Sequence, residues 1–511
     1  MDERPYRFAP RPARGALFGL RAGQLAGLVA SGGLALGLLQ LGGVRGLALA
    51  LLALAVGAGV LLAPVWGLTV GQWTPILLRF LLGGERRRFR TGRAGAGHVV
   101  RIPERGLDPQ PAEPAWSFPA ELAGLQLVDG ELAQYQNAQF GAAVEHGAYT
   151  AALRVRGPAF SLAAPELRER MLAEYGAVLA ALARDDCPVR RVSWIERTLP
   201  GDGDALGDYL LQAKRADATL EEPPEELVSY LQLLDRAGDV AAEHELMFCV
   251  QIDTRRPAGR RAVARMGGGT SGALGVLAGE LGQLIELLDH AGITVTGVLT
   301  RRGLAASIRD TYDPWGARQR HRQVTGGSAG EGIAPHTAGP AARDEHWTYL
   351  ESDGAFHCAL WAAEWPRVDV RALFLQPLLT DSRATRTVAM CMELVGPSRA
   401  IRRAERAATE TQTEQHLRKR VGQRTSQRQS QRDTAAATRE RELAEGHALI
   451  RYAAYVTVSV PSSTADPRGA LESDVSRVDL EAKRAPLRLE RMWGQQAEAF
   501  TYTLPLCRGL K

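Results

Sequence analysis

Few residues in this chain have the types and spacing of a catalytic or ligand-binding motif. The clearest candidate is a glycine pattern. Gly267, Gly269 and Gly272 satisfy G-x-G-x-x-G, the spacing that lets a backbone approach a pyrophosphate. In dinucleotide-binding folds the glycine loop directly follows a strand. Here a long arginine-rich loop separates the glycines from a strand that we expect to end at Asp253. The pattern therefore favours a flexible basic turn over a nucleotide site.

Two histidines have neighbouring carboxylates that suggest metal ligands. The residues are His244 with Glu243 and Glu245, and His346 with Asp344 and Glu345. Adjacent residues of a strand point to opposite faces, so neither group converges on one ion. We interpret both as charges at strand edges. The sequence also contains no H-E-x-x-H motif, and we predict no catalytic, cofactor-binding or metal-binding residue and no cofactor.

The scarcity of lysine excludes one class of enzyme. A Walker nucleotide site needs a glycine-rich loop that ends in Lys followed by Ser or Thr. None of the lysines has this setting; they are Lys214, Lys419, Lys483 and Lys511. The five cysteines are scattered without paired spacing, which indicates free thiols in a reducing cytoplasm. The chain is therefore not predicted to be an ATPase motor.

Two long apolar runs, residues 22–43 and 46–66, lie near the start of the chain and are separated by a turn that contains Arg45. Each is long enough to cross a hydrocarbon core, which takes about 20 residues. Arginines flank the pair, including Arg21 before it and Arg86, Arg87 and Arg88 after it. The positive-inside rule then places both termini in the cytoplasm. We expect a two-span protein of the cytoplasmic (inner) membrane; a buried hairpin of a soluble protein is the alternative.

Residues 67–93 have the pattern of an amphipathic segment on a membrane surface. Trp66 and Trp73 suit the interface, and the arginines that follow suit anionic lipid. An ordinary linker helix is the alternative. The net charge of +5 is largely accounted for by these flanking arginines, so direct DNA contact is not expected.

The remaining sequence predicts a cytoplasmic α+β protein. Strand, helix and strand patterns recur, with βαβ units of the ferredoxin-like kind, and the repeat of 450–460, 468–483 and 487–492 indicates two related halves. The charged segment at 397–446, which we call the charged arm, is interpreted as a solvated helix with many ion pairs. A contact surface for another subunit is the alternative. The expected organisation is a basic tail (1–21), a hairpin (22–66), a surface segment (67–93), an α+β domain (94–315), a flexible linker (316–344) and a second α+β domain (345–511).

Three segments match a known group of proteins in their order along the chain. They are TYDPWGA at 311–317, AEWPRVDV at 363–370 followed by LFLQPLL, and RLERMWGQQAEAFTYTLPL at 488–506. With the two-span start, the chain resembles actinobacterial membrane proteins of conjugation-like type IV secretion clusters. In that family a PrgI-like transmembrane hairpin is fused to a domain similar to the non-motor, amino-terminal half of the conjugation ATPase.

The resemblance implies a non-catalytic scaffold that anchors and docks a separate Walker-containing ATPase. It also implies other secretion subunits and membrane lipid as partners, and an oligomer. Interfaces favour aromatic residues at their centres, so candidates for partner docking are Trp361, Trp365, Trp493 and Phe500, with ordinary core packing as the alternative. A membrane component of a type VII secretion complex is the second hypothesis. A membrane-tethered enzyme such as a glycosyltransferase is the third, and it requires an acidic metal-binding pair.

Overall fold

The structure, a computed structural model, divides into two compact units. The sheet unit comprises Met1–Arg7, Arg86–Ala400 and Leu443–Lys511, and the hairpin unit comprises Phe8–Glu85 and Ile401–Glu442. The residues that the structure describes are 5, 6, 8, 22–40, 43–62, 64, 65, 68–82, 118–132, 138–200, 229, 242–317, 332–380, 384–406, 409, 438, 441 and 448–510.

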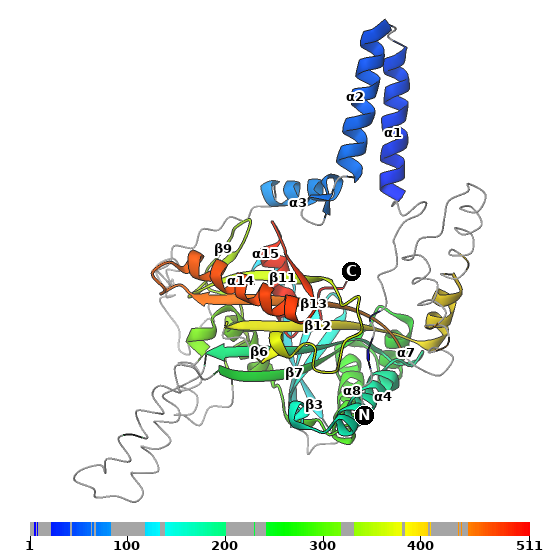
Figure 1. Ribbon diagram of the computed structural model, residues 1–511. Helices are drawn as coiled ribbons and strands as arrows, with labels where there is room; N and C mark the ends of the chain where they lie inside the picture. The colour runs from blue at the N-terminus through cyan, green and yellow to red at the C-terminus, as the bar shows by residue number, and fades with distance from the viewer. Residues whose placement is uncertain are drawn as a thin grey trace, which may run out of the picture. The chain divides into compact units, whose positions relative to one another are not determined.

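The hairpin unit contains two apolar helices, α1 (Ala22–Leu39) and α2 (Gly43–Leu62), which lie side by side (Figure 1). Both are rich in Ala and Leu, which favour helix, and Arg45 is their one charged residue. A short ladder between β1 (Pro64–Val65) and β2 (Leu68–Thr69) leads into α3 (Val70–Leu82). At about 1.5 Å per residue, α1 and α2 are each close to the thickness of a hydrocarbon core.

A twelve-stranded sheet forms the centre of the sheet unit, and its neighbouring strands are all antiparallel. The strands are β3 (Gln126–Leu132), β4 (Ala138–Glu145), β5 (Ala148–Arg156), β6 (Val189–Pro200), β7 (Ala242–Asp253), β8 (Thr294–Val298), β9 (Arg343–Glu345), β10 (Leu350–Ser352), β11 (Ala355–Glu364), β12 (Arg386–Val395), β13 (Leu449–Pro461) and β14 (Arg488–Arg491). Their order is β3-β4-β5-β7-β6-β12-β13-β11-β10-β9, with β8 paired to β5 and β14 paired to β11. The predicted α+β class is thus confirmed, and the structure adds that the sheet is large and antiparallel.

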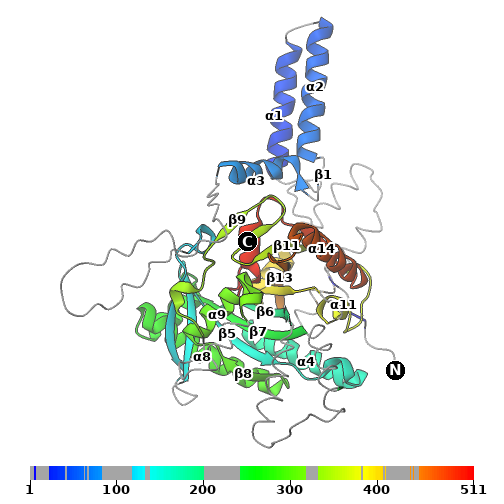
Figure 2. The same ribbon diagram turned by 90° about the vertical axis from the view of Figure 1, so that its left-hand side faces the viewer.

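The helices of the sheet unit connect these strands and cover both faces of the sheet (Figure 2). They are α4 (Pro165–Leu182), α7 (Pro257–Arg265), α8 (Gly269–His290), α9 (Arg301–Tyr312), α11 (Gln376–Leu379), α14 (Pro467–Arg484) and α15 (Gln496–Phe500). Four 3₁₀ turns add to them: η1 (Ala120–Leu122), η2 (Phe160–Leu162), η3 (Pro335–Thr337) and η4 (Thr501–Thr503).

The sheet consists of two halves with the same strand order. In the first half β5, β6, β7 and β8 follow one another in sequence and stand in the order β8-β5-β7-β6; in the second, β11, β12, β13 and β14 stand in the order β14-β11-β13-β12. A hairpin precedes each set, β3-β4 and β9-β10. The halves join where β6 pairs with β12, from Arg191↔Glu393 to Thr198↔Arg386. This is a repeated β-α-β-β-α-β pattern in one continuous sheet.

Side chains on the two faces of the sheet form separate cores. Along β12, Met392 and Leu394 pack in the cluster that contains α4 and α8, whereas Ala389 and Cys391 pack in the cluster that contains α9 and α15. This alternation is the period of two that a strand imposes. Trp194 packs against both the α8 cluster and the α14 cluster, so the two large helices of the repeat lie on the same face.

The ranges expected as two domains, 94–315 and 345–511, each supply one half of this sheet. The range expected as a flexible linker, 316–344, contains η3 and part of β9, and Ala338 within it is 0% exposed. Of the charged arm at 397–446, residues 397–406 are helical, and most of the rest lies outside the described residues. The sequence also predicts two helices, 203–216 and 223–236, and both lie outside the described residues except for Ser229, which is helical.

Candidate functional site

The two helices of the hairpin meet along small residues. Ser31 donates a hydrogen bond to the Gly27 carbonyl at 2.8 Å, and a Cβ at Gly57 would lie 2.8 Å from Ser31 Cβ. Ala35 on α1 and Ala50 on α2 are each only 2% exposed. The small-residue spacing at Gly33 and Gly37 does not contribute to this contact, because both are exposed with nothing near a built Cβ. Small side chains therefore let the α1 and α2 backbones approach closely.

The outer surface of the hairpin is almost entirely apolar. Large hydrophobic side chains on it are between 42% and 84% exposed, and they are Val29, Leu34, Leu36, Leu39, Val44, Leu47, Leu49, Leu51, Leu52, Leu54 and Val56. Soluble proteins rarely leave a contiguous apolar surface of this extent uncovered. Lipid or a partner protein is the kind of environment that such a surface requires.

Length and apolarity alone identify a different helix as able to span a membrane. Among the described residues, α8 meets both conditions, while the apolar stretches within the hairpin, Ala26–Leu39 and Val44–Gly59, are shorter. However, Leu277, Leu281 and Leu284 of α8 are 0% exposed in the core of the sheet unit. The apolarity of α8 is thus explained by packing on the sheet, and the spanning role of the hairpin stays a prediction.

Two of the residues predicted to anchor the chain can be located. Arg45 is exposed in the first turn of α2, so it belongs to the helix and not to the preceding turn as expected. Trp73 lies half-buried on α3, a helix that also exposes Leu77, Leu78 and Leu81 by 46% to 60%. The other predicted anchoring residues lie outside the described residues, namely Arg21, Trp66, Arg86, Arg87 and Arg88.

The four aromatic residues predicted as docking candidates do not share one surface. Phe500 is 0% exposed, with its ring 4.5 Å from that of Tyr312 and 4.8 Å from that of His357. Trp361 packs in the small cluster beneath α15, whereas Trp365 packs in the α14 cluster on the opposite face. Phe500 is thus a core residue, and the two tryptophans lie on different sides of the sheet.

Trp493 and Trp365 each have a partner within the chain. The Arg491 guanidinium lies 5.2 Å from the Trp493 ring centre, a cation–π distance. Trp365 meets Tyr452 edge to face at 4.9 Å. Both tryptophans are half-buried, so part of each ring is open to solvent.

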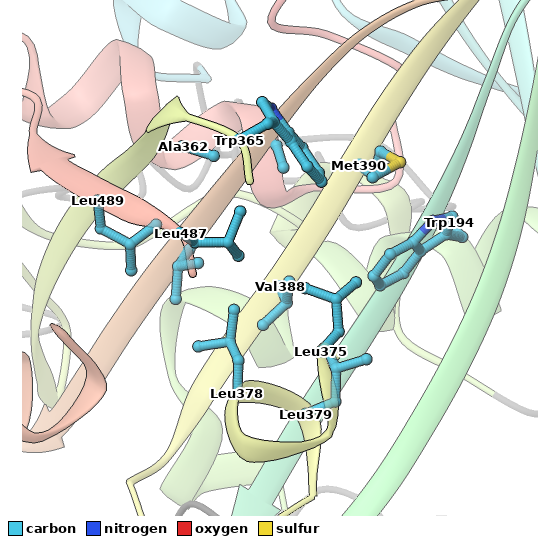
Figure 3. Close-up of a pocket in the computed structure, with 12 residues that line it drawn as sticks. Trp194, Ala362, Trp365, Leu375, Leu378, Leu379, Val388, Met390, Leu487 and Leu489 are labelled. Carbon is cyan, nitrogen blue, oxygen red and sulfur yellow. The ribbon is translucent and has the colours of Figure 1, made fainter. Parts of the chain in front are cut away.

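A small apolar pocket of about 20 Å³ lies on the α14 face, close to the junction of the two halves (Figure 3). Trp194 and Met390, which face each other across the β6–β12 junction, form one side, and Leu375 and Leu379 beside α11 form another. The volume admits about one water molecule, although the lining offers it no polar partner. Among its described residues, the crossover between β11 and β12 contains the four-residue α11, whereas the corresponding crossover of the first half contains the 18-residue α4.

The glycine pattern forms an elbow between two helices and does not follow a strand directly. Gly267, Gly268 and Gly269 have φ angles of +89°, +76° and +64°, which glycine adopts without strain. A Cβ at Gly272 would lie 2.9 Å from the Val263 carbonyl oxygen, so this glycine is needed for the close approach of α8 to α7. Since α7 separates Asp253 from the glycines, the dinucleotide-binding arrangement is absent here.

The predicted strand-edge histidines pair with nearby carboxylates. His244 Nδ1 lies 2.6 Å from Glu196 Oε1 on the neighbouring strand, and His346 Nε2 lies 3.4 Å from Asp344. Glu245 pairs with Arg197 and with Arg154. Burial alone would raise the pKa of the Glu245 carboxyl, but these two arginines outweigh it and lower the pKa to about 2. These charges hold β5, β6 and β7 together as ion pairs.

A cluster that the sequence patterns did not reveal lies where β7 and β12 end. Two buried carboxylates, Asp253 and Glu393, are 2% and 5% exposed at their side chains. Asp253 accepts from Arg190 at 2.5 Å and from Arg255 at 3.0 Å. Glu393 accepts at 2.7 Å from each of two arginines, which are Arg256 and Arg451.

Four arginines thus share two carboxylates in this cluster. Burial favours the protonated carboxyls, but the hydrogen bonds and charges of the arginines outweigh it and lower the pKa of both Asp253 and Glu393. The pKa of the Arg256 guanidinium is lowered by burial and by the charge of Arg190. The arginine-rich run at 254–265 is the one sequence signal that pointed here. Asp253 directly precedes this run, but Glu393 comes from a distant strand.

No group of three or more His, Cys, Asp or Glu side chains suited to a metal ion occurs in the part of the chain that the structure describes. All five cysteines are buried free thiols. Burial is the main cause that raises the pKa of the Cys187, Cys358 and Cys391 thiols to about 12. Comparison with protein-family models and with curated protein sequences finds no match to this chain.

Proposed function

We propose that this protein is a non-catalytic, membrane-anchored scaffold whose hairpin spans the cytoplasmic membrane twice. The observation that carries the proposal is the exposed apolar surface of α1 and α2, together with a seam of small residues between them. A hairpin of a soluble protein would turn its leucines inward, whereas here alanine and glycine face inward and leucine faces outward. That distribution suits lipid, in which small residues form helix contacts.

Helix α3 fits the role of a segment at the membrane surface. Its exposed leucines occupy one side, and Trp73 lies near its start. An amphipathic helix of this composition lies in the plane of the headgroups, with the apolar side toward the acyl chains. With arginines on both flanks of the hairpin, the positive-inside rule places both termini and the sheet unit in the cytoplasm.

For the biological setting, we propose a conjugation-like type IV secretion apparatus in which the sheet unit docks a separate ATPase. The resemblance of three segments supports this assignment, and two of them meet in the fold. Tyr312 in the first segment and Phe500 in the last have ring centres 4.5 Å apart. The sheet unit would consist of two ferredoxin-like repeats, in agreement with the repeated strand order.

The membrane assignment is tested first, on the full-length chain in its native membrane. We expect the protein to resist alkaline carbonate extraction and to float with vesicles, and a Leu51→Arg, Leu52→Arg double variant to lose membrane insertion. Leu162→Arg is a matched control because Leu162 is 87% exposed on the sheet unit. Extraction of the wild-type protein by carbonate would refute the two-span anchor.

The scaffold assignment is tested by purifying the tagged full-length protein in mild detergent and identifying the subunits that accompany it. We expect a Walker-containing ATPase of the conjugation type. Recovery of a type VII ATPase would instead assign the chain to a type VII secretion complex. A protein that purifies alone and as a monomer would contradict the scaffold role, although the membrane assignment would stand.

A further inference from the structure

Helix α7 presents a surface of positive charge that the scaffold role does not explain. Its sequence, PAGRRAVAR, contains three arginines and no acidic residue. Arg260, Arg261 and Arg265 are exposed, and Gly259, Ala262 and Val263 are buried against the sheet unit. Arg255 and Arg256 immediately precede the helix and add to the same run of charge. We call residues 255–266 the arginine patch.

The carboxylates near the arginine patch are already occupied. Asp253 and Glu393 are shared among four arginines, which leaves the cluster positively charged. Of the described residues, none forms an ion pair with Arg260 or Arg265, and Arg261 donates to the Pro257 carbonyl at 3.2 Å. Like charges three to four positions apart on a helix repel each other. The patch therefore carries an electrostatic cost that an anionic partner would relieve.

The second half of the sheet unit provides an internal comparison. There α14 contains four cations and four acids, and two of the cations pair within the helix, Arg477 with Asp474 at 3.0 Å and Lys483 with Asp479 at 2.6 Å. It also exposes one large apolar residue, Leu480, by 60%. A solvent-facing helix of this sheet unit can thus carry balanced charge. Of α7 and α14, α7 is the one with an excess of positive charge.

The arginine patch is held rigidly. A Cβ at Gly259 would overlap the Asp253 carbonyl oxygen, so α7 lies directly against the end of β7. At its other end, Gly272 brings α8 against the Val263 and Met266 carbonyl oxygens. Because both ends of α7 are fixed, its arginines lie on a pre-formed surface. Binding of a partner therefore requires little further ordering of the helix.

Met266 identifies the kind of partner that fits this surface. It follows Arg265 directly and is 56% exposed, an apolar side chain among cations. Residues 255–271 contain no aromatic side chain on which a base of single-stranded nucleic acid would stack. A cationic helix with an apolar residue at its margin has the composition of surfaces that bind anionic bilayers.

We propose that the arginine patch docks the sheet unit onto the anionic headgroups of the membrane, with Met266 entering the headgroup layer. This inference rests on the proposed membrane anchor, since the hairpin keeps the bilayer at a high local concentration. Each arginine near an anionic surface favours the docked state by about fivefold, so three arginines favour it by on the order of a hundredfold. The docked state should weaken as salt screens the charges.

The test uses the full-length chain with Met266→Cys carrying an environment-sensitive dye, which is feasible because the five native thiols are buried. The protein is placed in nanodiscs of phosphatidylcholine alone or with phosphatidylglycerol at about three to one. We expect blue-shifted emission and protection from iodide only in the anionic discs. The shift should disappear in high salt and in the R260Q/R261Q/R265Q variant, and should persist in R260K/R261K/R265K.

A dye at Leu480→Cys on the charge-balanced α14 is the matched control and should not respond to lipid composition. Equal Met266→Cys emission in both kinds of disc would overturn the docking inference while leaving the anchor intact. Failure of the wild-type chain to enter either disc would overturn the anchor and the docking together. A shift in neutral discs that appears only when duplex DNA is added would assign the patch to nucleic acid and refute the lipid proposal.

Discussion

The stability of this fold at different pH values depends on single buried polar residues. His357 is 0% exposed, and its two ring nitrogens lie 2.7 Å from Ser352 Oγ and 2.8 Å from Ser459 Oγ. Burial, the largest effect, lowers the pKa of this imidazole to about 4. The imidazole of His357 is therefore neutral in the folded state. Its protonation must disrupt the hydrogen bonds that it forms with the two serines.

Acidification should consequently destabilise the sheet unit. The contribution of His357 is fully present above its unfolded pKa near 6.5 and is lost as the pH falls toward about 4, a change of about 3 kcal/mol at most. Urea unfolding of the detergent-solubilised protein across this range measures it. The His357→Gln variant should be less stable at neutral pH but should show a smaller decline on acidification. Equal declines in the two proteins would show that His357 is not the group responsible.

The carboxylates of the arginine cluster give a second prediction at this scale. Glu393→Gln removes the charge that holds Arg256 and Arg451, and breaking such a buried pair costs about 3 to 5 kcal/mol. Glu364→Gln is a suitable control because Glu364 is 41% exposed at its side chain and pairs only with exposed arginines. Its loss should cost less than about 1 kcal/mol. Similar unfolding free energies for the two variants would contradict the structural role of Glu393.

At the scale of elements, the seam of the hairpin depends on a small residue at position 57. Gly57→Leu would force α1 and α2 apart, because even a Cβ there overlaps Ser31 Oγ. Overpacking of this kind costs about 1 to 3 kcal/mol. A Cβ at Gly59 meets nothing within 4 Å, so Gly59→Leu is the matched control. Titration with SDS, followed by the loss of helix–helix contact, should show a lower midpoint for Gly57→Leu only.

The sequence was most informative where structure depends on local pattern. The apolar runs predicted α1 and α2 closely, because length and composition are enough to specify such helices. The strand at 450–460 was also predicted, since β-branched and apolar residues cluster there. Turn geometry was harder: Arg45 was expected in a turn and lies in a helix, because α2 begins at Gly43, two residues before it.

Contacts between distant segments account for what the sequence did not reveal. The pairing of β6 with β12 joins residues almost 200 positions apart, and no local pattern specifies that register. For the same reason Phe500 was taken as a docking candidate, although Tyr312 and His357 enclose it. The arginine–carboxylate cluster combines four segments, and only its run at 254–265 was visible in the sequence.

For the whole molecule, the junction of the repeats determines whether the sheet unit unfolds in one step. Trp194 and Met390 face each other at the centre of the β6–β12 pairing, and Trp194 packs against the cores of both halves. The hydrogen-bonded ladder and the shared core couple the halves. We therefore expect the most protected amides of β7 and of β13 to exchange with the same free energy, that of global unfolding.

This coupling is testable by breaking the junction. Ala389→Pro places proline in a central strand, where it removes a ladder hydrogen bond from the β6–β12–β13 region. Protection should fall together in β7 and in β13, although β13 is next to β12 and β7 is separated from β12 by β6. Leu480→Pro, on the exposed side of α14 and remote from the junction, should also lower protection in both strands, because halves that unfold together share one free energy of unfolding. If Ala389→Pro lowered protection in β13 and left β7 unchanged, the two repeats would be independent folding units within one sheet.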